Sequence, residues 1–134
     1  MMKWLAGYGA AGVVMLVLDF AWLSVVAPTV YRPEIGAVLA ERINLAAAAL
    51  FYLVYVAGVV VLAAQPGVKA QSVLAACTYG AVLGLVAYAT YDLTNLATLK
   101  VWSVKVAVID IAWGAAMTAV ASATAYFAMT AVGE

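Results

Sequence analysis

The chain has no histidine, a single cysteine and few charged residues, and each of these shortages excludes a class of function. Imidazole is the usual nitrogen ligand of haem, di-iron and zinc sites, so we expect no such metal centre and no cofactor. The lone cysteine, Cys77, cannot form an internal disulfide, and its apolar surroundings predict a packing role. Six Lys and Arg residues balance six Asp and Glu residues, which leaves no basic surface for nucleic acid.

Hydrophobic residues, in contrast, are abundant: they make up 69% of the 134 residues, whereas charged residues make up 9%. A soluble domain carries about 25% charged residues. Apolar stretches of about 18 residues or more recur along the whole length, which is typical of a protein that crosses the membrane several times. We therefore predict one all-α transmembrane domain over residues 1–134, in contact with membrane lipid.

Four membrane spans are predicted, at residues 4–26, 43–64, 73–98 and 102–129. Pro28 ends the first span, Pro33 starts a short interfacial helix before the second, and QPGVK forms the turn that follows it. The lysine and apolar run at the start resemble a signal peptide, but the run continues far enough to span the bilayer. The short connections predict an antiparallel four-helix bundle with up-down-up-down topology.

Two further patterns concern packing and orientation. Gly80 and Gly84 form a GxxxG pair, which favours close approach of two membrane helices. The positive-inside tendency predicts a cytoplasmic location for the two loops on the side with more Lys and Arg. That side carries Arg32, Arg42, Lys100 and Lys105, and the side of the termini carries Lys3 and Lys69.

The polar residues are predicted to gather near one membrane face. Asp19 lies about seven residues before the end of the first span, Asp92 about six before the end of the third, and Asp110 about eight after the start of the fourth. These three span ends share a side of the bundle, so at ~1.5 Å per residue the carboxylates lie about 9–12 Å from one surface. The same side also carries Arg42, Asn44, Asn95 and Lys105.

Spacing along the helices favours a shared site. Each of the three aspartates is followed, three positions later, by a tryptophan or an asparagine, and residues at that spacing share a helical face. The hexapeptides VLDFAW in the first span and VIDIAW in the fourth are nearly the same, so their Asp–Trp pairs frame a cavity if these antiparallel helices face each other. The predicted ligand-binding residues are Asp19, Trp22, Arg42, Asn44, Tyr88, Asp92, Asn95, Lys105, Asp110 and Trp113.

A purely structural role competes with a ligand site. Buried pairs of Asp with Arg42 or Lys105 would hold a bundle in register. Trp102, at the edge of a span, is typical of an interface anchor, and Tyr88 equally fits ordinary helix packing. A single Asp near the centre of a span costs ~2.5–3.5 kcal/mol on insertion scales. Three carboxylates at one depth therefore favour a ligand or ion site over packing alone.

Several of these motifs resemble one family. The runs YDLTNLATLK, W-x-x-K, D-I-A-W-G and L-D-F-A-W-L are similar to those of DUF2177, a family of small bacterial membrane proteins. The resemblance covers essentially the whole chain and implies a four-span protein of the bacterial inner membrane, without an established activity. The signature positions that it implies are Asp19, Trp22, Tyr91, Asp92, Leu93, Thr94, Asn95, Asp110, Trp113 and Gly114.

Three functions fit this pattern. The first is binding or transport of a small polar or cationic ligand, or of a lipid head group, in a carboxylate-lined pocket. The second is a membrane-embedded enzyme of lipid modification, in which aspartates hold Mg²⁺ against a phosphate or act as acid and base, with no catalytic residue assigned. The third is an accessory subunit of a larger membrane complex. Its partners would be membrane proteins, and a homo-oligomer is the other assembly that the small size allows.

Overall fold

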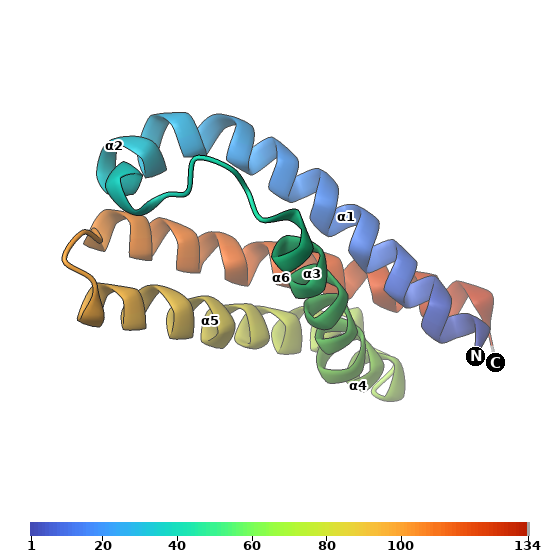
Figure 1. Ribbon diagram of the computed structural model, residues 1–134. Helices are drawn as coiled ribbons and strands as arrows, with labels where there is room; N and C mark the ends of the chain where they lie inside the picture. The colour runs from blue at the N-terminus through green and yellow to red at the C-terminus, as the bar shows by residue number, and fades with distance from the viewer. Residues whose placement is uncertain (134) are drawn as a thin grey trace.

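Helices make up nearly all of the protein, and the computed structural model describes residues 1–133 (Figure 1). The first helical segment comprises α1 (Met2–Val26), a π-helical turn η1 (Ala27–Tyr31), α2 (Arg32–Ile35) and a 3₁₀ turn η2 (Gly36–Val38). The second comprises α3 (Leu45–Val59), a π-helical turn η3 (Val60–Ala64) and α4 (Gln65–Lys69). The last two helices are α5 (Val73–Thr98) and α6 (Val104–Val132).

Four of these segments are long and apolar enough to cross a membrane: Met2–Val38, Leu45–Lys69, Val73–Thr98 and Val104–Val132. No strand occurs among the described residues, in keeping with the rule that backbone groups in lipid must be satisfied within a helix or a closed barrel. The all-α, four-span antiparallel bundle predicted from the sequence is therefore confirmed. Both termini lie at one end of the molecule, and α2 and the α5–α6 loop lie at the other (Figure 1).

The first two spans are longer than predicted because each helix continues past its proline. Pro28 lies inside η1, and Pro66 is the second residue of α4, the helix that follows η3. Proline lacks an N–H and its ring clashes with the carbonyl four residues earlier in an α-helix. A π-helical turn has a wider hydrogen-bond spacing, which removes that conflict without ending the helix. The QPGVK segment is accordingly the last helical turn of the second span, and the reversal of direction follows at Gln71, which has a positive φ of 51°.

Small residues bring α5 and α6 into close contact, as the GxxxG pair predicts. A Cβ atom added to Gly84 would lie 2.2 Å from the carbonyl oxygen of Gly114, and one added to Gly80 would lie 2.3 Å from Oγ of Ser122. Only glycine permits so close an approach of two helix backbones. α6 makes its most extensive contacts with α5 and then with α1, so it is the central helix of the bundle.

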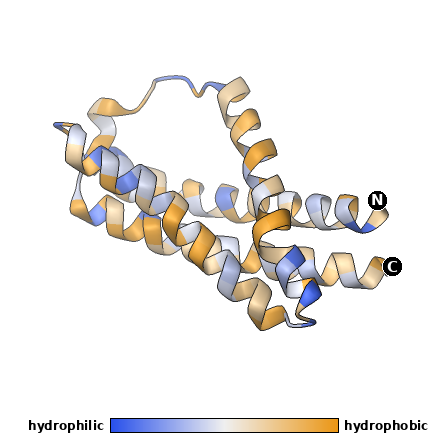
Figure 2. Cartoon of the chain, turned by 90° about the horizontal axis from the view of Figure 1, so that it is seen from below, coloured by the Kyte–Doolittle hydropathy of each residue, from blue (hydrophilic) through white to orange (hydrophobic). Residues whose placement is uncertain are grey.

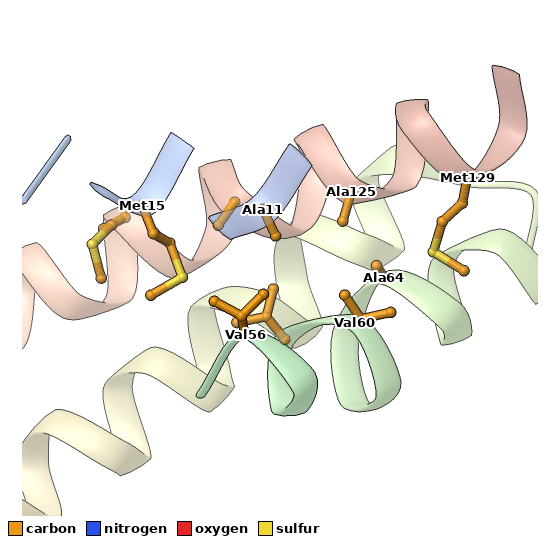
Figure 3. Packing of buried hydrophobic residues seen from close by; sticks show 10 residues of the cluster. Ala11, Met15, Val56, Val60, Ala64, Ala125 and Met129 are labelled. Carbon is orange, nitrogen blue, oxygen red and sulfur yellow. The ribbon is translucent and has the colours of Figure 1, made fainter. Parts of the chain in front are cut away.

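The apolar core lies in the half of the bundle nearer the termini. Methionine, valine and alanine side chains from α1, α3, η3 and α6 interlock there, with no polar atom among them (Figure 3). The core residues are Ala11, Met15, Val56, Val59, Val60, Ala64, Met117, Ala121, Ala125 and Met129. The polar residues therefore concentrate in the other half, toward α2 and the α5–α6 loop.

α3 leaves the bundle at a steep angle, and residues 39–44 form an extended connection between the bundle end and the start of α3 (Figures 1 and 2). The first ten residues of α3 contribute no buried side chain, and the first buried residue of this helix is Val56. α3 itself contacts α1 and α6, and the η3 turn that follows it packs on α5 and α6. The divergence leaves a wedge between α3 and α5, and the candidate site lies in this wedge.

Candidate functional site

The two Asp–Trp motifs of α1 and α6 face each other and exchange hydrogen bonds. Asp19 accepts a hydrogen bond from the indole Nε1–H of Trp113 at 3.1 Å. In the other direction, Trp22 donates through Nε1–H to the hydroxyl of Tyr31 at 3.0 Å, and Tyr31 donates to Oδ1 of Asp110 at 2.9 Å. Each aspartate is thus linked by hydrogen bonds to the tryptophan of the opposite helix, directly for Asp19 and through Tyr31 for Asp110.

The two indole rings stack at the centre of this arrangement. The centroids of Trp22 and Trp113 are 4.3 Å apart, and the ring planes differ by 9°. The D-x-x-W spacing places the acid and the indole of each helix on one face, about one turn apart. Because α1 and α6 run antiparallel, the acid of one helix lies beside the indole of the other. We call these four side chains and Tyr31 the Asp–Trp clasp.

Asp19 has a second donor, the hydroxyl of Tyr52 on α3. Both oxygens of this carboxyl group therefore have a donor. The contact with Tyr52 also fixes the middle of α3 against α1. Further along α3, the hydroxyl of Tyr55 lies 2.8 Å from Oγ1 of Thr118, so hydrogen bonds connect α3 to both of its neighbours in the bundle.

Asp92 on α5 has a different environment. Its side chain is 0% exposed, and neither carboxyl oxygen has a hydrogen-bond partner among residues 1–133. Asp110 and the indole of Trp102 are its polar neighbours across the helix interface, and the Nε1–H of Trp102 is likewise buried without a partner. Leaving buried polar atoms unpaired costs about 1–3 kcal/mol for each group. Polar groups buried at such a free-energy cost inside a membrane protein are typical of functional sites.

An aromatic groove of about 430 Å³ occupies the wedge between α3 and α5. Its walls consist of rings in contact: Phe51 and Tyr55 are stacked 5.2 Å apart, and Tyr55 meets Tyr88 edge-to-face at 6.3 Å. Among residues 1–133, Asp110 is the only charged residue that lines it. The complete lining is Phe51, Tyr55, Ala87, Tyr88, Tyr91 and Asp110.

A smaller cavity of about 130 Å³ lies on the other side of Tyr91 and Asp110, toward the loop end of the bundle. Tyr91 and Asp110 line both spaces, so these two side chains separate the groove from the cavity. Tyr91 meets Trp102 edge-to-face at 5.6 Å, which holds it in this position. The lining of the smaller cavity is Tyr31, Ile35, Leu39, Tyr91, Trp102, Val106 and Asp110.

The ten residues proposed from the sequence occupy different places. Six of them lie together: Asp19, Trp22, Asp110 and Trp113 in the clasp, Tyr88 in the groove wall and Asp92 beside Asp110. Asn95 is half-buried on α5, adjacent to Tyr91. Arg42, Asn44 and Lys105 are exposed and lie apart from this group.

Asn44 has a local role, because its Oδ1 accepts a hydrogen bond from the backbone N–H of Ala47 at 3.1 Å and so caps α3. Arg42 lies in the extended connection, and Lys105 is in the first turn of α6 with its side chain exposed. The two cations that the sequence offered as partners for the aspartates are therefore exposed side chains. Phenol and indole donors take that place instead.

Sequence reasoning missed several side chains of the candidate site, all of them aromatic. Tyr31 and Tyr52 supply donors to the clasp, and Phe51, Tyr55 and Trp102 line the groove or the cavity. The available signal was the presence of tyrosines within alanine- and valine-rich spans, since a buried Tyr hydroxyl needs a partner. That signal does not reveal which partner each hydroxyl finds.

The chemistry of the groove suits a cation. A carboxylate attracts positive charge, and the faces of Phe and Tyr rings carry the negative end of their quadrupole. Within the described part of the chain, no three His, Cys, Asp or Glu residues come close enough together to hold a metal ion. The arrangement therefore fits an organic cation better than a metal.

Comparisons with known proteins agree with the architecture. The family model DUF2177, described as a predicted membrane protein, matches residues 4–127. No curated protein and no solved structure matches the chain.

Proposed function

The chain belongs to the DUF2177 family of predicted membrane proteins, and we propose that it binds an ammonium group in the aromatic groove between α3 and α5. The ligand is the amine-bearing head group of a membrane lipid or a small organic cation of the same chemistry. Asp110 acts as its counter-charge, and Phe51, Tyr55, Tyr88 and Tyr91 form the walls. The bacterial inner membrane is the proposed location, since helical spans are typical of that membrane and closed barrels of the outer one.

The observation that carries this proposal is the charge of the groove. Asp110 lines it, and no Lys or Arg is among its lining residues. Tyr31 supplies one hydrogen bond to Asp110, which stabilises the carboxylate but leaves its negative charge uncompensated. An alkylated ammonium group offers a diffuse positive charge and an apolar surface, and aromatic rings bind both.

The position of the groove favours a ligand that is attached to, or partitions into, the bilayer. Tyr91 and Phe51 are 55% and 44% exposed, so the walls reach the surface that faces lipid. A volume of about 430 Å³ holds a trimethylammonium or aminoethyl group with part of its chain. The site lies in the half of the bundle away from the termini, where a lipid head group would enter from the nearer membrane surface.

Isothermal titration of the purified protein in detergent tests the proposal. We expect choline to bind and 3,3-dimethylbutan-1-ol, its uncharged isostere, to bind at least tenfold more weakly. Asp110→Asn should abolish this preference, because a charge pair at about 4 Å contributes ~4 kcal/mol at an effective dielectric constant of about 20. Glu41→Gln makes the same chemical change at an exposed position and should leave binding unchanged. Equal binding of both compounds to the unaltered protein would contradict the proposal.

Native mass spectrometry distinguishes the two sources of the ammonium group. Protein released from nanodiscs of phosphatidylcholine should retain lipid, and protein from phosphatidylglycerol nanodiscs should not, if the ligand is a lipid head group. Retention of free choline but of neither lipid would assign a small soluble cation. The same spectra report a stoichiometric partner or a second copy, which is the result expected of an accessory subunit.

A lipid-modifying enzyme is the second candidate, and the juxtaposition of Asp92 and Asp110 favours it. Two neighbouring carboxyls, one without hydrogen bonds and one held by Tyr31, resemble a general acid and a general base in different environments. The lipid profiles of cells carrying the unaltered protein and Asp110→Asn decide this point. Identical profiles would exclude an enzymatic role for the pair in those cells.

A further inference from the structure

The three aspartates of the spans, of which Asp19 and Asp92 are buried and Asp110 is half-buried, have three different sets of hydrogen-bond donors. Asp19 accepts from Trp113 and Tyr52, and Asp110 accepts from Tyr31. Asp92 accepts from no group among residues 1–133, although it is 0% exposed. Donors stabilise the ionised form of a carboxyl group, and their absence in a buried place disfavours it. One residue type therefore occurs here with two donors, one donor and none.

Asp92 and Asp110 are neighbours across the α5–α6 interface, and two adjacent carboxyls in a poorly hydrated site do not ionise together. Tyr31 supports the charge on Asp110. The proton of the pair consequently resides on Asp92, and the pair carries one negative charge when the groove is empty. Exchange of this proton for one monovalent cation leaves the total charge of the site unchanged.

We propose that the proton on Asp92 and the cation in the groove oppose each other's binding, so that binding of the cation releases the proton to water. This inference rests on the proposed function. A positive charge beside Asp110 also stabilises the ionised form of Asp92, because the two carboxyls are adjacent. Linkage then requires the reverse effect: protonation of Asp92 weakens binding of the cation by the same factor.

The structure provides separate places for the two exchanging ions. The cation occupies the groove, which opens between α3 and α5. The proton leaves toward the smaller cavity, whose lining includes Trp102 and Asp110, the two polar neighbours of Asp92. A volume of about 130 Å³ accommodates roughly four water molecules at ~30 Å³ each. Leu39 and Trp102 place the outer end of this cavity at the loop end of the bundle, away from the groove.

The groups that face Asp92 identify it as the titrating residue. Asp110 on α6 and Tyr31 in η1 face it from the neighbouring elements, and Trp102 faces it from the α5–α6 loop. On its own helix the adjacent titratable group is Tyr91. Tyrosine does not ionise in the range where a buried aspartate does. A pH dependence of binding between about pH 5 and about pH 9 therefore reports the carboxyl pair.

The dissociation constant of choline, measured by titration calorimetry from about pH 5 to about pH 9, tests the inference. Affinity should rise with pH by up to about tenfold per unit, since one proton is displaced, and should level off where Asp92 is already ionised in the free protein. Asp92→Asn mimics the protonated acid and should bind choline with an affinity that does not change with pH. Glu41→Gln should retain the pH dependence of the unaltered protein.

A second measurement requires no variant. Addition of choline to the protein in weakly buffered solution with a pH indicator should release up to one proton per cation bound. Choline binding that is independent of pH and releases no proton overturns the proposed exchange. An Asp92→Asn variant whose choline affinity still changes with pH as in the unaltered protein overturns it too. Both results leave the proposed function intact. Absence of choline binding at every pH, with retention of neither lipid, overturns the proposed function itself.

Discussion

Substitution of Gly84 by alanine should separate α5 from α6 and disturb the groove. Its added Cβ would lie 2.2 Å from the carbonyl oxygen of Gly114 and 2.7 Å from Oγ1 of Thr118. Ordinary van der Waals contact begins at 3.4 Å, so the two helices must move apart by about 1 Å. The obstructing atom belongs to backbone and cannot rotate away. The ring of Tyr88 packs against Gly114, so the displacement of α6 from α5 also shifts the groove wall.

The expected cost follows from this geometry. Overpacking of a well-filled interior costs typically 1–3 kcal/mol, and a collision with backbone belongs at the upper end of that range. We expect Gly84→Ala to lower the free energy of unfolding by about 3 kcal/mol and the melting temperature by about 5–10 °C. The affinity for choline should fall as well, because Tyr88 moves with the interface.

Gly58→Ala is the matched control, because a Cβ at Gly58 meets nothing within 4 Å. Alanine is the better helix former by up to about 1 kcal/mol, so this variant should melt at the same temperature or higher. Thermal unfolding in detergent, followed by far-ultraviolet circular dichroism, compares the two substitutions. Equal melting temperatures for Gly84→Ala and Gly58→Ala would refute the close approach of α5 and α6 as a source of stability.

Two predictions concern the Asp–Trp clasp. Asp19→Ala leaves the hydroxyl of Tyr52 and the indole N–H of Trp113 without an acceptor, and should lower stability in SDS titration by about 2–4 kcal/mol, more than Asp19→Asn does. Equal losses in the two variants would show that these donors need no acceptor at position 19. Tyr31→Phe removes the hydrogen bond to Asp110 and should weaken choline binding about three- to tenfold in calorimetry. A hydrogen bond to a charged group contributes ~1.5–3 kcal/mol, and we expect part of this free energy to be lost from binding. Unchanged affinity would mean that Tyr31 does not support the charge on Asp110.

The sequence by itself determined the number of spans and their helical nature, and it predicted a common depth for the polar residues. Long apolar stretches permit no other spanning structure of this size, because every backbone polar group in lipid must be satisfied within its own helix. The rise per residue then placed Asp19, Asp92 and Asp110 near one face without any knowledge of packing. The repeated D-x-x-W spacing likewise indicated that α1 and α6 present matching faces.

Only the tertiary structure decided which of these residues meet. Each span is apolar around its whole circumference, so no periodicity in the sequence shows which face of a helix is buried. The partners of the clasp are far apart in the chain: Tyr31 and Asp110 differ by 79 positions, and Asp19 and Trp113 by 94. The steep course of α3 opens the groove and leaves Arg42 outside it, and this course also depends on packing between helices. In lipid, side-chain shape and hydrogen bonds determine that packing, whereas hydrophobic patterning does not.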